Sequence, residues 1–321
     1  MPETTPTSSS QPTEKTFRSY SQEQGKAYAS HRRAYHDKLY EFIIQYHTSG
    51  GGQFDTLVDI GCGPGLAVRD LAPHFTHAIG LDPSEGMVST ARSLGGVSSN
   101  SEPIRFEVSS AEELGSNLSP AVQDGSVDLL IAATAAHWFN MSAFLPRAAQ
   151  ILKPGGTVAI WTGGSVVVGP STPNAGEIQA ALDELDDQLE PYKEEGNRLV
   201  RNLYAKLPLP WTLPTPVREF DQESLMRKEW GTGDGAEPLH EFHAVTAPLS
   251  MEAIEKVLGT ASPVTRWRAA NPDLMNTESD VVRIMRRKVE KALHDAGVEE
   301  GKELVSGGVR GVLLAFKKKA Q

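Results

Sequence analysis

The chain is poor in the groups from which disulfides and metal centres are built. Among its 321 residues Cys62 is the single cysteine, which excludes an internal disulfide and a cysteine-based zinc cluster. Two histidine pairs, His31 with His36 and His240 with His243, have the spacing of metal ligands, but no further Cys/His cluster accompanies them. We therefore predict no metal site.

Long apolar runs and positive net charge are also missing. No apolar segment approaches the roughly 20 residues that span a bilayer. The formal net charge of −10 disfavours nucleic acid or an anionic membrane as a general partner. The opening residues, MPETTPTSSSQPTEK, lack the features of a secretory signal or a transit peptide. Together with the lone thiol, these absences favour a cytoplasmic protein with a small-molecule partner, no nucleic acid and no membrane.

Strand and helix patterns alternate in the first half of the chain. Strands are predicted at TLVDI (56–60), HAIGL (77–81), IRFEVS (104–109), VDLLIAA (127–133) and TVAIWT (157–162). Helical patterns lie between them, at 65–72, 84–94 and 141–152, and Ser84 can cap the second of these helices. This alternation predicts an α/β fold with a doubly wound, mostly parallel sheet.

The stretch LVDIGCGPGLAVRDL (57–71) joins the first predicted strand to a helix. Its closely spaced glycines let backbone approach a ligand. A triphosphate-binding loop would need Gly-Lys-Ser/Thr, which is absent, and Leu66 stands where the dinucleotide fingerprint has its third glycine. Asp82, at the end of the second strand, can accept both hydroxyl hydrogens of a ribose. The pattern fits an adenosine ligand without pyrophosphate as well as a dinucleotide.

Four motifs in order extend this pattern: VDIGCGPG, GLDPS, SSAEEL and LKPGG. In this combination the chain resembles the class I S-adenosylmethionine-dependent methyltransferases. The resemblance implies a seven-stranded sheet and S-adenosyl-L-methionine as cofactor, with S-adenosyl-L-homocysteine as its product and no metal. The residues it assigns to the cofactor are Tyr28, Arg32, Asp59, Gly61, Cys62, Gly63, Gly65, Asp82, Pro83, Met87, Ser110, Ala111, Glu112 and Ala133. Cys62 fits as a small loop residue and has no acid–base partner that would make it a nucleophile.

Other segments narrow the resemblance. The stretches YASHRRAYHDKLYEFIIQYH (28–47), AATAAHWFN (132–140), LGTASPVTRW (258–267) and the closing GVLLAF resemble the trans-aconitate methyltransferase-like group. That likeness implies methylation of a carboxylate on a small di- or tricarboxylic acid. One departure is Arg-Arg-Ala-Tyr at 32–35, where relatives commonly have Arg-Pro-x-Tyr.

Methyl transfer requires an in-line arrangement and exclusion of water more than acid–base help. A carboxylic acid is already ionised at neutral pH, whereas a phenol needs a base. The alternatives are a phenol or amine methyltransferase of specialised metabolism, a non-catalytic binding protein for the cofactor, and an NAD-dependent dehydrogenase. A labelled-transfer panel and a cofactor protection test discriminate among them.

Candidate acceptor-binding residues surround the position after the fourth strand. They are Arg32, Tyr35, His137, Trp138, Trp161, Arg266 and Trp267. His137 is a candidate base or positioning group, or a packed histidine of the pocket wall. Arg32 and Arg266 can grip a carboxylate through paired hydrogen bonds, although Arg32 can instead hold the methionine carboxylate of the cofactor. The tyrosines and tryptophans are predicted to form a lid and walls, or simply to pack.

The chain divides into five predicted regions. They are a disordered tail at 1–16, an N-terminal helical lid at 17–53, a cofactor-binding core at 54–165, a substrate-covering insertion with a sheet strand at 166–275, and a C-terminal helix with a final sheet strand at 276–321. Within the lid, the apolar spacing predicts one helix from Tyr28 to Tyr46.

Overall fold

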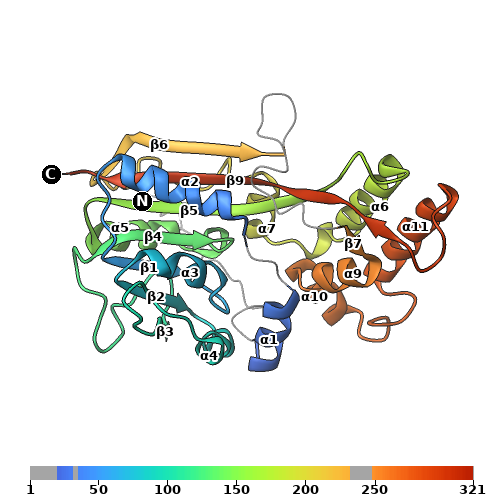
Figure 1. Cartoon of the computed structure of the whole chain (residues 1–321), viewed down its shortest axis with the longest axis horizontal. Coiled ribbons are helices and arrows are strands. Elements are labelled where there is room, and N and C mark those ends of the chain that lie inside the picture. Colours follow the sequence, from blue (N-terminus) through green and yellow to red (C-terminus); the bar gives the residue numbers. More distant parts are fainter. Residues whose placement is uncertain (1–19, 32–34, 232–247, 321) are drawn as a thin grey trace, which may run out of the picture.

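A seven-stranded sheet forms the centre of the protein (Figure 1). The structure is a computed structural model that describes residues 20–31, 35–231 and 248–320. The sheet strands are β1 (Thr56–Ile60), β2 (His77–Asp82), β3 (Arg105–Val108), β4 (Val127–Ala133), β5 (Leu152–Val168), β6 (Phe220–Trp230) and β9 (Gly307–Lys318). Their order is β3-β2-β1-β4-β5-β9-β6; β1 to β5 run parallel and β9 is antiparallel to both of its neighbours. The predicted doubly wound, mostly parallel sheet is confirmed.

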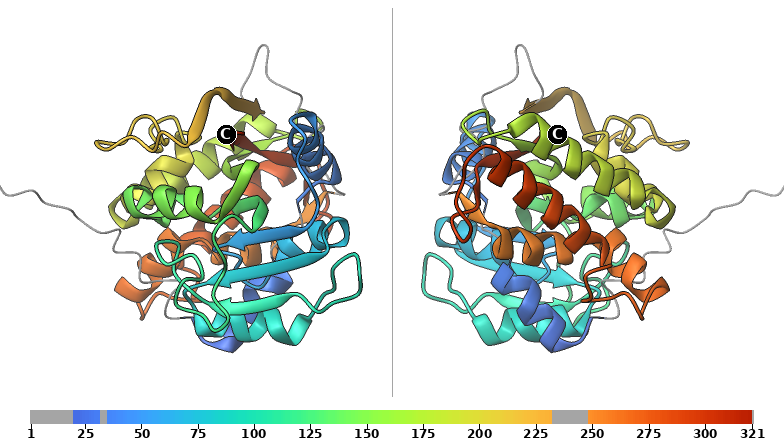
Figure 2. Two further views of the ribbon diagram at one scale, coloured as in Figure 1. Left: turned by 90° about the vertical axis from the view of Figure 1, so that its left-hand side faces the viewer. Right: turned by 90° about the vertical axis from the view of Figure 1, so that its right-hand side faces the viewer.

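Helices cover both faces of this sheet (Figure 2). They are α2 (Asp37–Ser49), α3 (Leu66–Leu71) and α4 (Glu85–Leu94) on one face and α5 (Met141–Ile151) on the other, while α1 (Gln22–His31) packs against α4. Successive strand residues alternate between faces, so Leu57 packs with α2, α3 and α4 while Val58 packs with α5. Because both faces are covered, every residue of β1 is buried.

A second group of elements lies where β5 and β9 extend beyond the parallel strands (Figure 1). It contains α6 (Ala175–Gln188), α7 (Glu195–Arg201), α9 (Met251–Gly259), α10 (Ser262–Ala270), α11 (Val281–Asp295), and the short strands β7 (Leu249–Ser250) and β8 (Leu304–Val305). Apolar side chains of α6, α9 and α11 form a separate core with Val168 of β5. Asp280 caps α11 by accepting a hydrogen bond from the amide of Val282 at 3.0 Å.

Two boundaries differ from the sequence predictions. The single helix expected from Tyr28 to Tyr46 is wrong: α1 ends at His31, and α2 begins after His36, whose ring accepts a hydrogen bond from the amide of Lys38. The fifth strand was expected to end at Thr162, but it continues to Val168, with a register shift against β9 between Gly163 and Val166. By contrast, the predicted Ser84 cap is confirmed, since its hydroxyl accepts from the amide of Met87.

Across the described residues, no helix is both long enough and apolar enough to cross a membrane.

Candidate cofactor and substrate site

A cavity of about 580 Å³ opens at the carboxyl ends of the parallel strands. Its wall includes Gly61 after β1, Asp82 at the end of β2 and Ala133 at the end of β4. In doubly wound sheets this edge is where ligands bind, because neighbouring strand-to-helix connections diverge there. The cavity continues from the glycine loop to α6, α9 and α11.

The glycine loop bends in a way that few side chains tolerate. Gly61, Gly63 and Gly65 have φ of +69°, +53° and +83°, in the left-handed region that favours glycine. A Cβ on Gly61 would lie 2.5 Å from the Cβ of Ala135, so this glycine is needed for packing. A Cβ on Gly63 would meet no protein atom within 4 Å and Gly63 lines the cavity, so its bare backbone is available to a ligand.

Asp82 fixes the shape of the same loop. One carboxylate oxygen accepts from the amide of Gly63 at 2.9 Å, and the other accepts from the amide of Ser84 at 2.9 Å. The side chain is 8% exposed and lines the cavity. Each carboxylate oxygen can accept more than one hydrogen bond, so the residue has capacity for the hydroxyls of a ribose.

Asp59 lies beneath the loop and outside the cavity wall. Its carboxyl is fully buried, and neither oxygen has a hydrogen-bond partner of ordinary geometry among the described residues. Burial, with the nearby Asp82 carboxylate as the second cause, raises the pKa of Asp59 to about 8, although the Val68 amide and Arg69 oppose this shift. Because this pKa lies above 7, the Asp59 carboxyl is largely protonated and neutral at physiological pH.

The remaining predicted cofactor residues divide into two groups. Those in the cavity wall are Tyr28, Cys62, Pro83, Met87, Ala111, Glu112 and Ala133. Gly65 and Ser110 are outside it: a Cβ on Gly65 would strike Phe106, and the Ser110 hydroxyl hydrogen-bonds Glu113. Arg32 lies outside the described residues. Burial raises the pKa of the Cys62 thiol well above its ordinary value, which fits a packing role.

The loop, the carboxylate and the apolar Met87, which is 3% exposed, form a cradle whose chemistry fits an adenosyl group. Residues 58–160 match a family model described as a methyltransferase domain. A methyltransferase of Dictyostelium discoideum is 34% identical over 139 residues, which cover 43% of this chain and 47% of that protein. A Saccharomyces cerevisiae protein, described as an S-adenosylmethionine-dependent methyltransferase, is 35% identical over 134 residues, covering 42% and 43%.

A solved structure described as a type II methyltransferase from Anaeromyxobacter dehalogenans has the same fold, with a TM-score of 0.56, 23% identity, and coverage of 90% of this chain and 97% of that one. Residues 58–160 are therefore similar in sequence to methyltransferase domains, and the chain has the fold of that solved structure. The chain matches less than half the length of these two curated relatives.

His137 lies in the cavity wall, shortly after the end of β4. Its Nδ1 lies 2.7 Å from the hydroxyl of Tyr204, and the ring is 8% exposed. Burial lowers the pKa of His137 from 6.5 to about 3, so the imidazole is neutral at physiological pH. Trp138 also lines the cavity, with its ring centroid 4.6 Å from that of His137. Sequence reasoning missed Tyr204, because its residue spacing from His137 gives no local signal.

Aromatic rings from the amino-terminal segment lie against β5. Tyr35 and Trp161 both line the cavity and are edge to face, with ring centroids 5.4 Å apart. The Tyr35 hydroxyl is 3.0 Å from that of Thr134, and the fully buried Trp161 has no hydrogen-bond partner for its indole nitrogen among the described residues. The structure thus brings both predicted aromatic residues to the site, and adds Thr134, which the sequence analysis did not select.

Arg266 and Trp267 do not reach this wall. Arg266 donates to the carbonyl of Tyr192 at 2.7 Å, to the side chain of Asn197, and lies 3.6 Å from the Glu194 carboxylate. Trp267 is partly buried against the core of the insertion. Their role in binding an acceptor stays a prediction that these contacts do not support.

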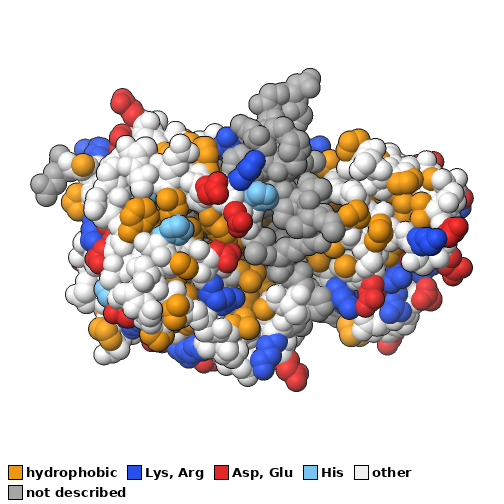
Figure 3. All heavy atoms as spheres, viewed as in Figure 1, with side chains coloured by type: hydrophobic (Ala, Val, Ile, Leu, Met, Phe, Trp, Pro, Cys, Tyr) orange, Lys and Arg blue, Asp and Glu red, His pale blue; other side chains and the backbone are white. Residues whose placement is uncertain are grey.

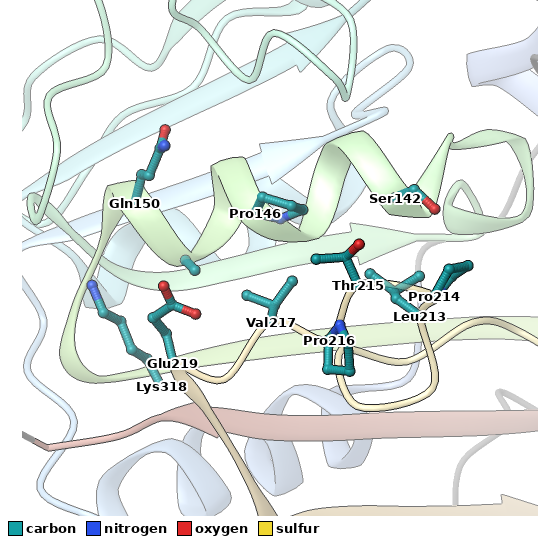
Figure 4. A pocket seen from close by; sticks show the side chains of 11 residues that line it. Ser142, Pro146, Gln150, Leu213, Pro214, Thr215, Pro216, Val217, Glu219 and Lys318 are labelled. Atoms are coloured by element: carbon teal, nitrogen blue, oxygen red, sulfur yellow. The ribbon is translucent and has the colours of Figure 1, made fainter.

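The protein also has a second hollow (Figure 4). Its volume is about 620 Å³, and it lies between α5 and the proline-rich segment 213–217. Pro146, Leu213 and Lys318 are among its lining residues, and the Lys318 ammonium already donates to the carbonyl of Leu152 at 2.7 Å. It contains none of the glycine-loop residues. The cavity at the strand ends is therefore the candidate site.

Proposed function

We propose that this chain is an S-adenosyl-L-methionine-dependent methyltransferase that methylates a carboxylate oxygen of a small molecule. The observation that carries the proposal is one continuous cavity: Gly63 and Asp82 line one part, and His137 and Trp138 line another. Cofactor and acceptor can therefore meet within one cavity, which is the positioning that methyl transfer requires.

The cofactor supplies an electrophilic methyl group on a sulfonium. An acceptor oxygen bonds to the methyl carbon while the carbon–sulfur bond breaks and its electron pair stays on sulfur, giving an ester and S-adenosyl-L-homocysteine. A carboxylate releases no proton in this step. Tyr28, Tyr35 and Trp138 surround the acceptor position and limit the entry of water.

His137 supports a carboxylate acceptor over a phenol. An imidazole whose pKa is about 3 is a weak base for a phenol with a pKa near 10, whereas a carboxylate needs no base. We assign His137 a positioning role, held by its hydrogen bond to Tyr204. A phenol or amine acceptor would instead need a base from outside this pair.

The first experiment tests the cofactor. S-adenosyl-L-homocysteine should raise the melting temperature of the full chain by mass action, and NAD should not. The second experiment measures transfer of labelled methyl from S-adenosyl-L-methionine to carboxylic acids and to phenols. Absence of a melting shift at concentrations far above micromolar refutes cofactor binding, and transfer to phenols alone refutes the carboxylate assignment.

A further inference from the structure

The part of the cavity beyond His137 and Trp138 has walls of unusual uniformity. They come from α6, α9, α10 and α11, from the link between α9 and α10, from the short strands β7 and β8, and from the ends of β5 and β9. The apolar residues among them are Val166, Val167, Val168, Ile178, Leu182, Leu249, Met251, Ile254, Val257, Leu258, Ala261, Pro263, Met285, Val289, Val305 and Val309. We call this set the apolar chamber. It contributes many of the apolar contacts that a ligand in this cavity can make.

Helix α9 presents one face to the apolar chamber. Ile254, Val257 and Leu258 recur at helical spacing, line the cavity and are only partly buried by protein. Half-buried aliphatic side chains around a hollow leave apolar surface that an apolar ligand would remove from water. A fully packed helix of the same sequence would bury this face against protein.

The side of α9 that flanks this apolar face is held by ion pairs. Glu255 accepts from Arg283 at 3.2 Å and from Arg286 at 2.8 Å, both on α11. Acidic and basic side chains are interspersed at this end of the molecule (Figure 3). The Ser250 hydroxyl caps the helix by accepting from the amide of Ala253. These contacts fix the orientation of α9 and so keep its apolar face directed at the cavity.

Polar groups in this region already have partners. Asn197 donates to the hydroxyl of Ser262 at 3.0 Å and accepts from the amide of Glu194 at 3.0 Å. The Ser306 amide donates to the hydroxyl of Thr172. An acceptor with several polar groups would have to displace these bonds to satisfy its own.

The charged side chains of the cavity wall also limit how many carboxylates the acceptor can carry. Among the described residues that line the cavity, Asp82 and Glu112 are the acidic side chains, and there is no lysine or arginine. One carboxylate beside the cofactor can pair with the sulfonium charge. A second or third carboxylate would enter an apolar space without a described counter-charge, which is strongly unfavourable.

From these observations we infer that the methyl acceptor is a monocarboxylic acid with an extended apolar body, whose body occupies the apolar chamber. This inference rests on the proposed function and specifies its substrate class. A small di- or tricarboxylic acid would leave the apolar chamber filled with water.

The experiment uses the full chain with S-adenosyl-L-homocysteine bound and measures the affinity of straight-chain acids from butanoate to decanoate by calorimetry. Each added methylene should tighten binding about fourfold while it enters the apolar chamber. In the catalytic assay, kcat/KM should rise in parallel, and propane-1,2,3-tricarboxylate should be the poorer acceptor. An affinity independent of chain length, or a preference for the tricarboxylate, overturns the inference.

Variants test whether the dependence of affinity on chain length arises in the apolar chamber. Leu258→Trp should fill part of the apolar chamber, so that decanoate binding falls at least tenfold while butanoate changes less than twofold. Leu274→Trp is the matched control, because Leu274 is 39% exposed and is not part of the cavity wall. Should Leu258→Trp fail to fold, Leu258→Ala replaces it, with weaker decanoate binding expected. Equal decanoate affinity in wild type and a folded chamber variant also overturns the inference.

The two proposals fail in different ways. If S-adenosyl-L-homocysteine does not bind at all, the proposed function is refuted before any acid is tested. If the cofactor product binds and the acids show no length dependence, the inference fails while the methyltransferase assignment stands.

Discussion

Replacing Gly63 with alanine tests the cofactor cradle with little ambiguity. The residue has a φ of +53°, and the added Cβ would meet no protein atom within 4 Å. The variant therefore loses stability only through the left-handed backbone, at roughly 1–2 kcal/mol for an L-residue. Nothing in the packing needs to move, so the protein should fold.

Because Gly63 lines the cavity, we expect the added methyl group to take up space there. The methyl group should shift the adenosyl ligand, which then loses part of its contacts with the loop, including one hydrogen bond worth about 1 kcal/mol. Its affinity should therefore fall at least tenfold. Isothermal titration with S-adenosyl-L-homocysteine measures this directly. Urea denaturation of the unliganded variant measures the backbone effect separately.

Gly125→Ala is the matched control. Gly125 has a φ of +62°, a Cβ there also meets nothing within 4 Å, and the residue is not part of the cavity wall. It should lose comparable stability and keep the wild-type affinity. If the two variants bind S-adenosyl-L-homocysteine equally well, the assignment of the glycine loop to the cofactor is refuted.

Three further predictions concern buried titratable groups. The pKa of His137 is about 3 in the folded state and 6.5 in the unfolded state, so protonation favours unfolding. The free energy of unfolding should therefore fall by up to about 1.4 kcal/mol per pH unit as the pH decreases from 6 to 4. Urea unfolding of His137→Phe should lack this contribution. Asp59 has its pKa raised to about 8, so stability is lost as pH rises from 4 towards 8; Asp59→Asn should be the more stable protein in denaturation at pH 8, and an unchanged midpoint contradicts this. Asp280 is fully buried, accepts from Arg268 at 2.8 Å and caps α11, so Asp280→Ala should destabilise by about 3–5 kcal/mol in urea, and a loss below 1 kcal/mol would show that solvent replaces the pair.

Much of the core was predictable because its signals are local. The continuous apolar run at 127–133 is β4, and TLVDI is β1 with the predicted bounds. The glycine spacing and Asp82 indicated a ligand at the strand ends, and these residues meet there through the hydrogen bond from the Gly63 amide. Each of these features depends on residues within one strand-to-helix unit.

Other features depend on contacts between distant segments. Apolar spacing runs across the break between α1 and α2, so periodicity predicted one helix, and a histidine cap gives little warning of the break. The guanidinium of Arg266 is suited to binding a carboxylate, but in the structure it contacts Asn197 and Glu194 instead. The apolar face of α9 resembles that of any packed helix, and its exposure to a hollow depends on where α6 and α11 lie.

The position of β9 has a consequence for biosynthesis. Among the residues that the structure describes, β9 is the one strand that pairs with β6, and β5 also needs β9 to complete its outer edge. A nascent chain that has emerged as far as β6 therefore exposes an unsatisfied strand edge to the translation machinery and to chaperones. Since Gly307, Gly308 and Val309 also contribute to the ligand cavity, the cavity wall is incomplete until β9 has left the ribosome.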